Sequence, residues 1–212
     1  MTKLDLRKEL GHLYKPSARQ VEIVRVPAWK FVMIDGQIEP GESPGTSPAF
    51  QDAMQALYGA AYTLKFMSKL RQDNPIDYPV MALEALWWVA ERGSEFDINR
   101  PEGWKWTAMI LQPDHITKKM VQEALLQLGK KRPSPALDKL RFERFREGPC
   151  IQIMHVGPYS EEPRTLEKMD AFARENGYAM RGKHHEIYLG DPRRTRPDKL
   201  KTILRHPIER IK

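Results

Sequence analysis

The residues of this chain best suited to chemistry lie in one short segment, residues 183–194. The segment alternates like a β-strand, in which successive side chains point to opposite faces. One face then carries a histidine, a carboxylate and a phenol: His184, Glu186 and Tyr188. The other face carries His185, Ile187 and Leu189 and is expected to pack in the core. The first face is therefore predicted to be a site rather than a packing surface.

A second predicted strand, residues 79–89, also holds one carboxylate among apolar side chains. Glu84, Leu86 and Trp88 share one face, and the odd-numbered residues share the other. An ionised carboxylate in an apolar strand is costly unless it is paired, hydrated or directed into a cavity. Either glutamate, taken alone, reads equally as a solvent-facing strand residue, but their similar settings favour a shared role.

We expect the two strands to occupy equivalent places, so that Glu84 and Glu186 face one cavity from opposite sides. Two carboxylates in a poorly hydrated cleft cannot both ionise easily, so the pKa of one should rise. One of them could activate a water as general base, while the other, or Tyr188, protonates the oxygen that gains charge. This reasoning predicts Glu84, Glu186 and Tyr188 as catalytic residues of a hydrolase.

Aromatic side chains near these strands are expected to wall the cleft. Trp87 is assigned mainly to the core and Trp88 mainly to the cleft, whereas alternation does not decide for Trp104 and Trp106. Such walls suit a flat organic ligand or a cation. The predicted ligand-binding residues are Trp88, Trp106, Trp104, Tyr58, Tyr62, His184 and Met109. The rings of His184 and His185 point apart in a strand, so we expect no metal site, and we expect no cofactor.

Composition argues against several other classes of protein. The chain has 212 residues, of which 41% are hydrophobic and 30% charged, as in globular proteins. It has no apolar run of the roughly 20 residues that span a bilayer and no signal peptide. Its single cysteine, Cys150, is expected to be a buried thiol. These features predict a cytoplasmic protein without a membrane partner.

The net charge of +7 gathers partly in residues 193–212. A basic surface can attract nucleic acid. These basic residues lack interleaved aromatics, and the chain has no helix-turn-helix or zinc finger. We therefore expect a solvated face and no nucleic-acid partner.

The chain reads as two similar halves, each with the order strand, helix, strand, strand. The first half has strand 30–36, a helix beginning at Ser47 and Pro48, and strands 79–89 and 104–111. The second half has strand 151–157, a helix ending at Asn176 and Gly177, segment 183–194 and strand 200–205. The predicted fold is α+β, made of tandem pseudo-twofold β-α-β-β repeats with helices on one face and a ligand cleft on the other.

We place an N-terminal extension at residues 1–20 and a single domain at residues 21–212. Its two repeats, at about 21–113 and 139–207, are joined by a helix at about 115–129 and a linker at 132–135. The loop at 37–46 reads equally as a binding loop or a surface insertion. Because an internal duplication can replace dimerisation, monomer and homodimer both stay open.

Three segments, 83–88, 104–113 and 184–194, resemble in sequence and order those of the stand-alone GyrI-like small-molecule-binding proteins. The resemblance covers roughly residues 20–207 and implies a duplicated SHS2-like fold. Relatives include ligand-binding domains of multidrug-sensing transcription regulators, and some stand-alone members are similar to hydrolases that open the strained cyclopropane of DNA-alkylating compounds. This chain departs from the regulators, because residues 1–20 are too short for a DNA-binding domain.

In this family the pocket carboxylates and aromatics are the working groups, and the residues that match are Glu84, Glu186, Trp88, Trp106 and Tyr188. The resemblance therefore implies a detoxifying or ligand-sequestering role, and the specific expectation is hydrolysis of reactive cyclopropane-containing xenobiotics. A non-catalytic module that binds hydrophobic cations would use the same cleft. A gyrase- or nucleic-acid-interacting protein would use residues 193–212, and the sequence does not separate these alternatives.

Overall fold

The computed structural model describes residues 1–89 and 103–211. The elements of the first half are β1 (Thr2–Lys3), α1 (Leu6–Glu9), α2 (Gly11–Tyr14), β2 (Glu22–Val26), β3 (Trp29–Gln37), α3 (Pro48–Lys69), β4 (Ile76–Asp77), β5 (Leu83–Val89) and β6 (Trp104–Gln112). Those that follow are α4 (Lys118–Lys131), α5 (Pro135–Asp138), β7 (Arg141–Phe145), β8 (Gly148–Val156), the 3-10 turn η1 (Tyr159–Glu161), α6 (Glu162–Glu175), β9 (Tyr178–Met180), β10 (His184–Tyr188), the 3-10 turn η2 (Pro197–Lys199) and β11 (Lys201–Arg210). No helix in these described ranges is long and apolar enough to cross a membrane.

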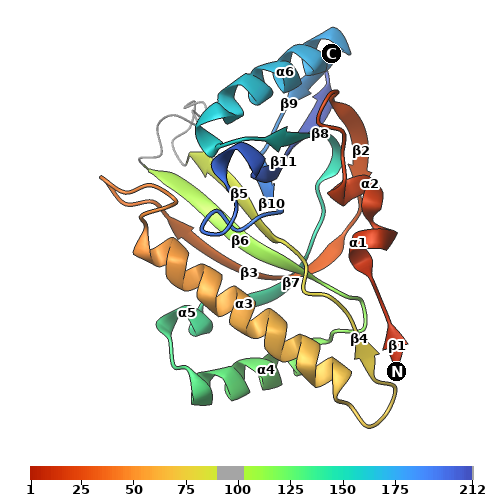
Figure 1. The fold of residues 1–212 in the computed structure, drawn as a ribbon, viewed down its shortest axis with the longest axis vertical. Coiled ribbons are helices and arrows are strands. Elements are labelled where there is room, and N and C mark those ends of the chain that lie inside the picture. Colours follow the sequence, from red (N-terminus) through yellow and green to blue (C-terminus); the bar gives the residue numbers. More distant parts are fainter. Residues whose placement is uncertain (90–102, 212) are drawn as a thin grey trace.

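An antiparallel sheet organises the molecule, with the strand order β2-β8-β11-β10-β5-β6-β3-β7 and β9 added to β11 (Figure 1). Each half supplies the predicted strand, helix, strand and strand: β3, α3, β5 and β6, then β8, α6, β10 and β11. β5 and β10 pair at the centre and join the halves. The predicted α+β class is confirmed, whereas descent of the halves from one duplicated module stays a prediction.

The sheet closes on itself because the ladder between β2 and β8 continues into the ladder between β3 and β7. Val26 of β2 pairs with Gly148 of β8, and Trp29 of β3 pairs with Phe145 of β7 in the same register. Two residues separate β2 from β3, and three peptide steps span at most about 11 Å. The strands at the two ends of the order, β2 and β7, therefore meet, and the sheet has an inner and an outer face.

Helices α3 and α6 both lie on the outer face, one over each half of the sheet (Figure 1). Pro48 begins α3, as predicted, because a proline is well tolerated in the first turn of a helix. Phe50 and Leu64 belong to the buried stripe of α3, which packs on β3 and β6. Met169 and Ala173 of α6 pack in a second core cluster with residues of β8 and β11. The two helices leave the centre of the outer face between them.

Gly36 of β3 is a glycine because Trp106 lies across it. The two residues pair between β3 and β6, and a Cβ on Gly36 would lie 2.1 Å from the Trp106 ring. Trp106 is buried and meets the ring of Phe50 edge-on, at 5.1 Å between centroids. This close approach helps to fix α3 above β3 and β6.

The register between β5 and β10 overturns one prediction about the faces. Ile187 pairs with Glu84, and Glu186 pairs with Ala85. Directly paired residues of an antiparallel ladder point to the same face. Glu186 therefore lies on the outer face and Glu84 on the inner face, and the prediction that they face one cavity is wrong.

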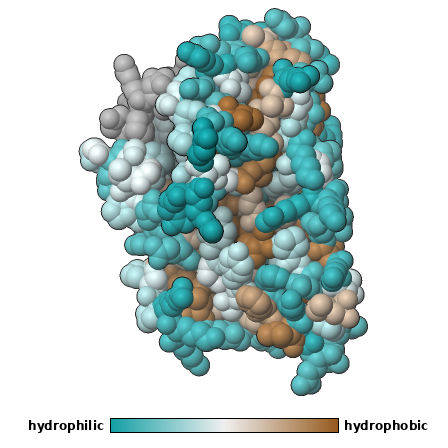
Figure 2. Space-filling model, in the orientation of Figure 1, coloured by the Kyte–Doolittle hydropathy of each residue, from teal (hydrophilic) through white to brown (hydrophobic). Residues whose placement is uncertain are grey.

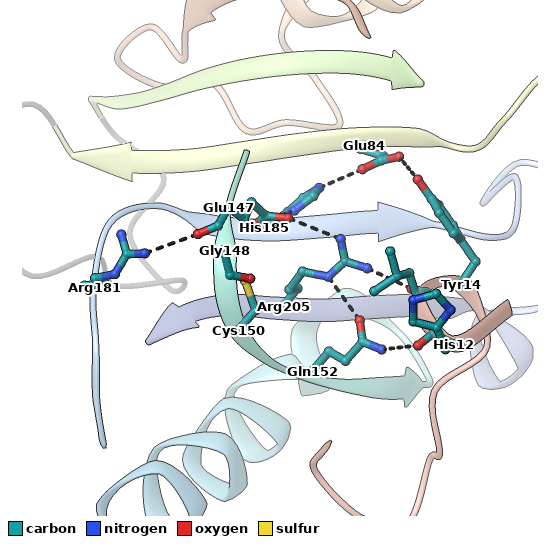
Figure 3. A network of polar contacts seen from close by, with 11 residues as sticks. His12, Tyr14, Glu84, Glu147, Gly148, Cys150, Gln152, Arg181, His185 and Arg205 are labelled. Carbon is teal, nitrogen blue, oxygen red and sulfur yellow. Dashed lines mark hydrogen bonds and ion pairs between the residues drawn. The ribbon is translucent and has the colours of Figure 1, made fainter. Parts of the chain in front are cut away.

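The inner face holds a buried network of charges (Figure 3). His185 lies between two carboxylates: its Nδ1 is 3.0 Å from Glu147 Oε1, and its Nε2 is 3.1 Å from Glu84 Oε2. Arg205 Nη1 lies 3.2 Å from Glu147 Oε2, and Arg205 Nε donates to Gln152 Oε1 at 3.0 Å. These five side chains are all buried, so each charge is compensated by a partner instead of by water.

The N-terminal segment covers one end of this network. Tyr14 donates its hydroxyl proton to Glu84 Oε1 at 2.6 Å, and Arg205 Nη2 donates to the carbonyl of Leu13 at 2.8 Å. Gln152 Nε2 donates to the carbonyl oxygen of His12 at 2.9 Å (Figure 3). The segment predicted as an N-terminal extension is thus anchored in the body of the molecule by buried hydrogen bonds.

Charges in the network shift two pKa values in opposite directions. Burial alone would lower the pKa of His185, but Glu147 and Glu84 raise it to about 9. Burial alone would raise the pKa of Glu147, but His185 and Arg205 lower it to about 2. At neutral pH the network therefore holds an imidazolium and a guanidinium beside its carboxylates.

We predict that the free energy of unfolding falls as pH rises from 6.5 to about 9, because His185 then keeps its proton in the folded protein but not in the unfolded chain. This stabilisation is complete below 6.5 and is lost as pH passes the folded pKa. It amounts to roughly 3 kcal/mol. Urea unfolding at a series of pH values measures it.

His185→Gln should remove this slope, and His12→Gln, which changes an exposed side chain, should keep it. Equal slopes in wild type and His185→Gln would contradict the prediction. If His185→Gln does not fold, titration of the wild-type imidazole by NMR reports the same pKa directly.

Candidate functional site

An open groove of about 2000 Å³ runs over the outer face, between α3 and the start of α6. The β5–β10 pair forms its floor and contributes Leu83, Trp87, Glu186 and Tyr188 to its lining. Figure 2 shows hydrophobic residues in a broken band down the middle of the view, flanked by polar residues. Apolar walls with a few convergent polar groups are the usual form of a small-molecule site.

The groove lies on the same face as the helices, so the prediction of a cleft on the opposite face is wrong. The physical reason is the closure of the sheet, which turns the opposite face into a filled interior. Inner-face residues such as Met109, Ile187 and Cys150 are all fully buried. The groove lies where α3 and α6 leave the outer face uncovered.

Glu186 is held on the groove floor by its neighbours. Tyr188 donates its hydroxyl proton to Glu186 Oε2 at 2.7 Å and accepts from Trp87 Nε1 at 3.1 Å. His184 Nε2 lies 3.2 Å from Glu186 Oε1. A hydroxyl has one proton, so Tyr188 orients the carboxylate and has no second proton for a ligand. Burial, together with the charge of Glu186, raises the pKa of Tyr188 well above its usual range.

Glu162 is the second carboxylate of the groove, and it is not among the residues predicted from sequence. It stands in the first turn of α6, is 1% exposed and lines the groove. Its Oε1 is buried and has no hydrogen-bond partner within residues 1–89 and 103–211. Burial, and then the charge of Glu186, raise the pKa of Glu162 far above its usual range, although a hydrogen bond from Thr202 opposes the shift. Glu162 is therefore a neutral carboxylic acid at neutral pH.

The groove thus contains a pair of carboxyl groups, as expected, but Glu162 and not Glu84 accompanies Glu186. Strand alternation could not find Glu162, because this residue lies on a helix. The available signal was the run Glu161-Glu162-Pro163, which places an acidic residue next to a proline at the start of a helix. The apolar stripe of that helix, which predicts its buried face, does not include Glu162.

Of two adjacent tryptophans, one has its expected surroundings and the other does not. Trp87, assigned mainly to the core, is 1% exposed and belongs to the hydrophobic core, where it packs against Phe50 at 5.2 Å between ring centroids and also lines the groove. Trp88 shares the inner face with Glu84, is half-buried, and carries Lys183 Nζ at 3.2 Å from its ring centroid. The prediction that Trp88 faces the groove is therefore wrong.

The remaining predicted ligand-binding residues divide into two groups. Three line the groove: Tyr58, Tyr62 and Trp104. Three are buried outside its lining: Trp106, Met109 and His184. Of this second group, His184 still acts on the site, because it contacts the Glu186 carboxylate.

The surroundings of His155 and Cys150 indicate structural roles. His155 Nδ1 is 2.9 Å from the hydroxyl oxygen of Thr165, and its Nε2 is 3.2 Å from the carbonyl oxygen of Pro158. Both ring nitrogens are therefore engaged. Cys150 is fully buried, and burial raises the pKa of its thiol far above the usual range.

Several basic residues of the C-terminal segment are paired with acids. Arg193 lies 3.0 Å from Asp191, and Arg196 lies 3.1 Å from Asp198. Arg205 is part of the buried inner network. These pairings reduce the positive charge that residues 193–212 offer to an anionic partner.

Comparisons with known proteins give one family match and similar solved structures. The family described as the GyrI-like small molecule binding domain matches residues 112–209. A structure of an uncharacterized conserved protein from Listeria innocua is 38% identical, with a TM-score of 0.85 over 97% of this chain and 100% of that one. A hydrolase from Listeria innocua is also 38% identical, with a TM-score of 0.83 over 98% of this chain and 100% of that one.

A more distant structural neighbour shows similarity of fold alone. The C-terminal domain of EcmrR is 10% identical, with a TM-score of 0.53 over 91% of this chain and 98% of that one. A search of curated proteins finds no match.

We predict that Glu162→Gln stabilises the protein, by an amount that grows as pH rises above 4.5. Above that value an unfolded chain ionises Glu162, whereas the folded protein keeps the proton, so wild-type stability falls with pH. A glutamine does not ionise and avoids this loss. Urea unfolding at about pH 5, 7 and 9 measures the difference. Glu161→Gln, which changes the exposed neighbour, should show no such trend, and a pH-independent difference for Glu162→Gln would refute the assignment.

Proposed function

The chain belongs to the GyrI-like small-molecule-binding family, and from this premise we propose that its groove binds lipophilic xenobiotics and hydrolyses a reactive cyclopropane in them. One observation carries the proposal: the carboxylate of Glu186 is fixed by Tyr188 at the floor of a groove with aromatic walls. The name hydrolase given to two Listeria innocua relatives, 36% and 38% identical, also supports it.

In the proposed reaction Glu186 acts as a general base toward a water molecule. The water oxygen attacks a methylene carbon of a cyclopropane that is conjugated to a carbonyl group. The new C–O bond forms as a ring C–C bond breaks, and the electron pair moves through the conjugated system to the carbonyl oxygen. Glu186 takes the water proton, and the carbonyl oxygen takes up a proton in turn. Release of ring strain favours opening.

The walls of the groove suit the planar part of such a compound. Trp87, Trp104 and Phe50 lie along it, and the ring of Tyr159 meets that of Tyr188 edge-on at 6.1 Å between centroids. Aromatic faces can hold a flat electrophile next to an oriented water, and this favours the reactive geometry. Tyr188 has a positioning role in this scheme, because its proton is engaged by Glu186.

We predict that Glu186→Gln lowers kcat for a spirocyclopropyl dienone by about 10² to 10⁴-fold, since an amide cannot accept the water proton. Binding of the dienone should persist, because the walls are unchanged. The absorbance change that accompanies aromatisation of the dienone to a phenol follows the reaction. Glu209→Gln, at an exposed position on β11, serves as the control. Full activity in Glu186→Gln would remove the proposed base.

A second candidate function is binding of lipophilic cations without turnover. The charge of Glu186 next to the aromatic walls favours it, because a carboxylate and π-faces both attract a cation. Calorimetry with a cationic dye and a neutral dye of the same shape tests this function. We expect the cation to bind more tightly and Glu186→Gln to abolish its advantage. Equal affinities for both dyes would eliminate this candidate.

A further inference from the structure

We propose that Glu162 is the proton donor of the groove: it hydrogen-bonds the carbonyl oxygen of the bound compound and gives that oxygen a proton as the ring opens. The inference rests on the proposed function and deepens it. It completes the acid and base pair with a residue that the family resemblance did not supply.

The first support is the position of Glu162 in the groove lining, with a buried carboxyl oxygen that has no hydrogen-bond partner in the described ranges. The side chain is 1% exposed, and the oxygen without a partner is Oε1. A buried polar atom without a partner destabilises the folded protein. A ligand oxygen placed in the groove would supply the missing partner.

The second support is what surrounds the carboxyl group. Glu186 and Tyr188 of β10, Thr202 of β11 and Tyr159 of η1 all interact with Glu162. These groups are an acid and three hydroxyls, and the positive charges of the inner network lie on the other side of the sheet. Nothing in this set favours the ionised form except the Thr202 hydroxyl. Glu162 therefore enters the reaction as an acid with a proton to give.

The third support is that Glu162 and Glu186 approach the ligand from different elements. Glu186 rises from the floor on β10, and Glu162 reaches in from the first turn of α6. Thr202, which bonds to Glu162, pairs with Tyr188, which bonds to Glu186. The acid and the base are therefore held by neighbouring side chains, close enough to influence each other's charge but on separate supports.

The proton balance of the step closes with these two residues. Glu186 removes one proton from the attacking water, while Glu162 transfers one to the oxygen that receives the electron pair. At the end Glu186 is neutral, Glu162 is ionised, and the product is a neutral alcohol and phenol. Transfer of one proton from Glu186 to Glu162, directly or through water, restores the starting state. No oxidant, reductant or other co-reactant is needed.

The arrangement also selects among substrates. A neutral carbonyl accepts a hydrogen bond from a carboxylic acid, whereas a compound with its own carboxylate next to the reacting ring would be repelled by Glu186. We therefore expect conjugated ketones and dienones to be the preferred substrate class, ahead of simple alkyl cyclopropanes, whose carbon skeleton offers no oxygen for the charge.

The test compares wild type, Glu162→Gln and the exposed neighbour Glu161→Gln, using the spirocyclopropyl dienone as substrate. We expect Glu162→Gln to lower kcat by about 10²-fold or more with KM changed much less, because an amide donates a hydrogen bond but no proton. The wild-type rate should fall at alkaline pH as Glu162 ionises, and this limb should vanish in Glu162→Gln. Glu161→Gln should match wild type in both respects.

If wild type hydrolyses the dienone and Glu162→Gln does so equally well over the whole pH range, this inference is wrong and the proposed function stands. If wild type does not hydrolyse it, the proposed function is wrong, and a binding measurement decides about Glu162. The probe is the same dienone with two methyl groups in place of the cyclopropane.

In that measurement wild type should bind the dimethyl dienone about tenfold more weakly once Glu162 is ionised at alkaline pH, and Glu162→Gln should show no such loss. That result supports Glu162 as the donor to a bound carbonyl independently of turnover. Affinity that does not change with pH in wild type, or absence of binding, overturns the inference.

Discussion

The pairing of β5 with β10 is the constraint on which the rest of the structure depends. It joins the two halves of the sheet, and its register decides which side chains reach the groove. Ile187 opposite Glu84 sends that carboxylate inward, and Ala85 opposite Glu186 brings the other one outward. A shift of one residue would exchange the two faces of β10 relative to β5, because side chains alternate with a period of two. The central ladder therefore sets both the composition of the core and the composition of the site.

The carboxyl groups on the two faces of this ladder differ in how their burial is compensated. Inside the sheet, the charges of Glu84 and Glu147 face His185 and Arg205, so burial is compensated by ion pairs. In the groove, Glu162 has an acidic neighbour and stays protonated. The inner arrangement gives a structural core with matched charges. The groove arrangement keeps a proton on a buried carboxylic acid at a cost in stability, which is typical of functional sites.

The N-terminal segment connects the inner network with the groove on the outer face. Tyr14 lines the groove, and its hydroxyl is bonded to Glu84 in the inner network. Glu84 thus acts on the groove indirectly, through a wall residue that it holds in place. This gives a physical role to a carboxylate that the family resemblance placed among the working groups, without requiring that it touch a ligand.

The sequence by itself determined the strand-helix-strand-strand order of each half, the central strands, the start of α3 at Pro48, and the alternation that groups His184, Glu186 and Tyr188 on one face. These are local properties, set by side-chain period and by residues that favour helix ends. It could not determine how the faces of β5 and β10 match, that closure of the sheet fills the face expected to be open, or that Glu162 of α6 meets Glu186. Register, closure and contact between a helix and a strand depend on residues far apart in the chain, so only the tertiary structure decided which carboxylates share the groove.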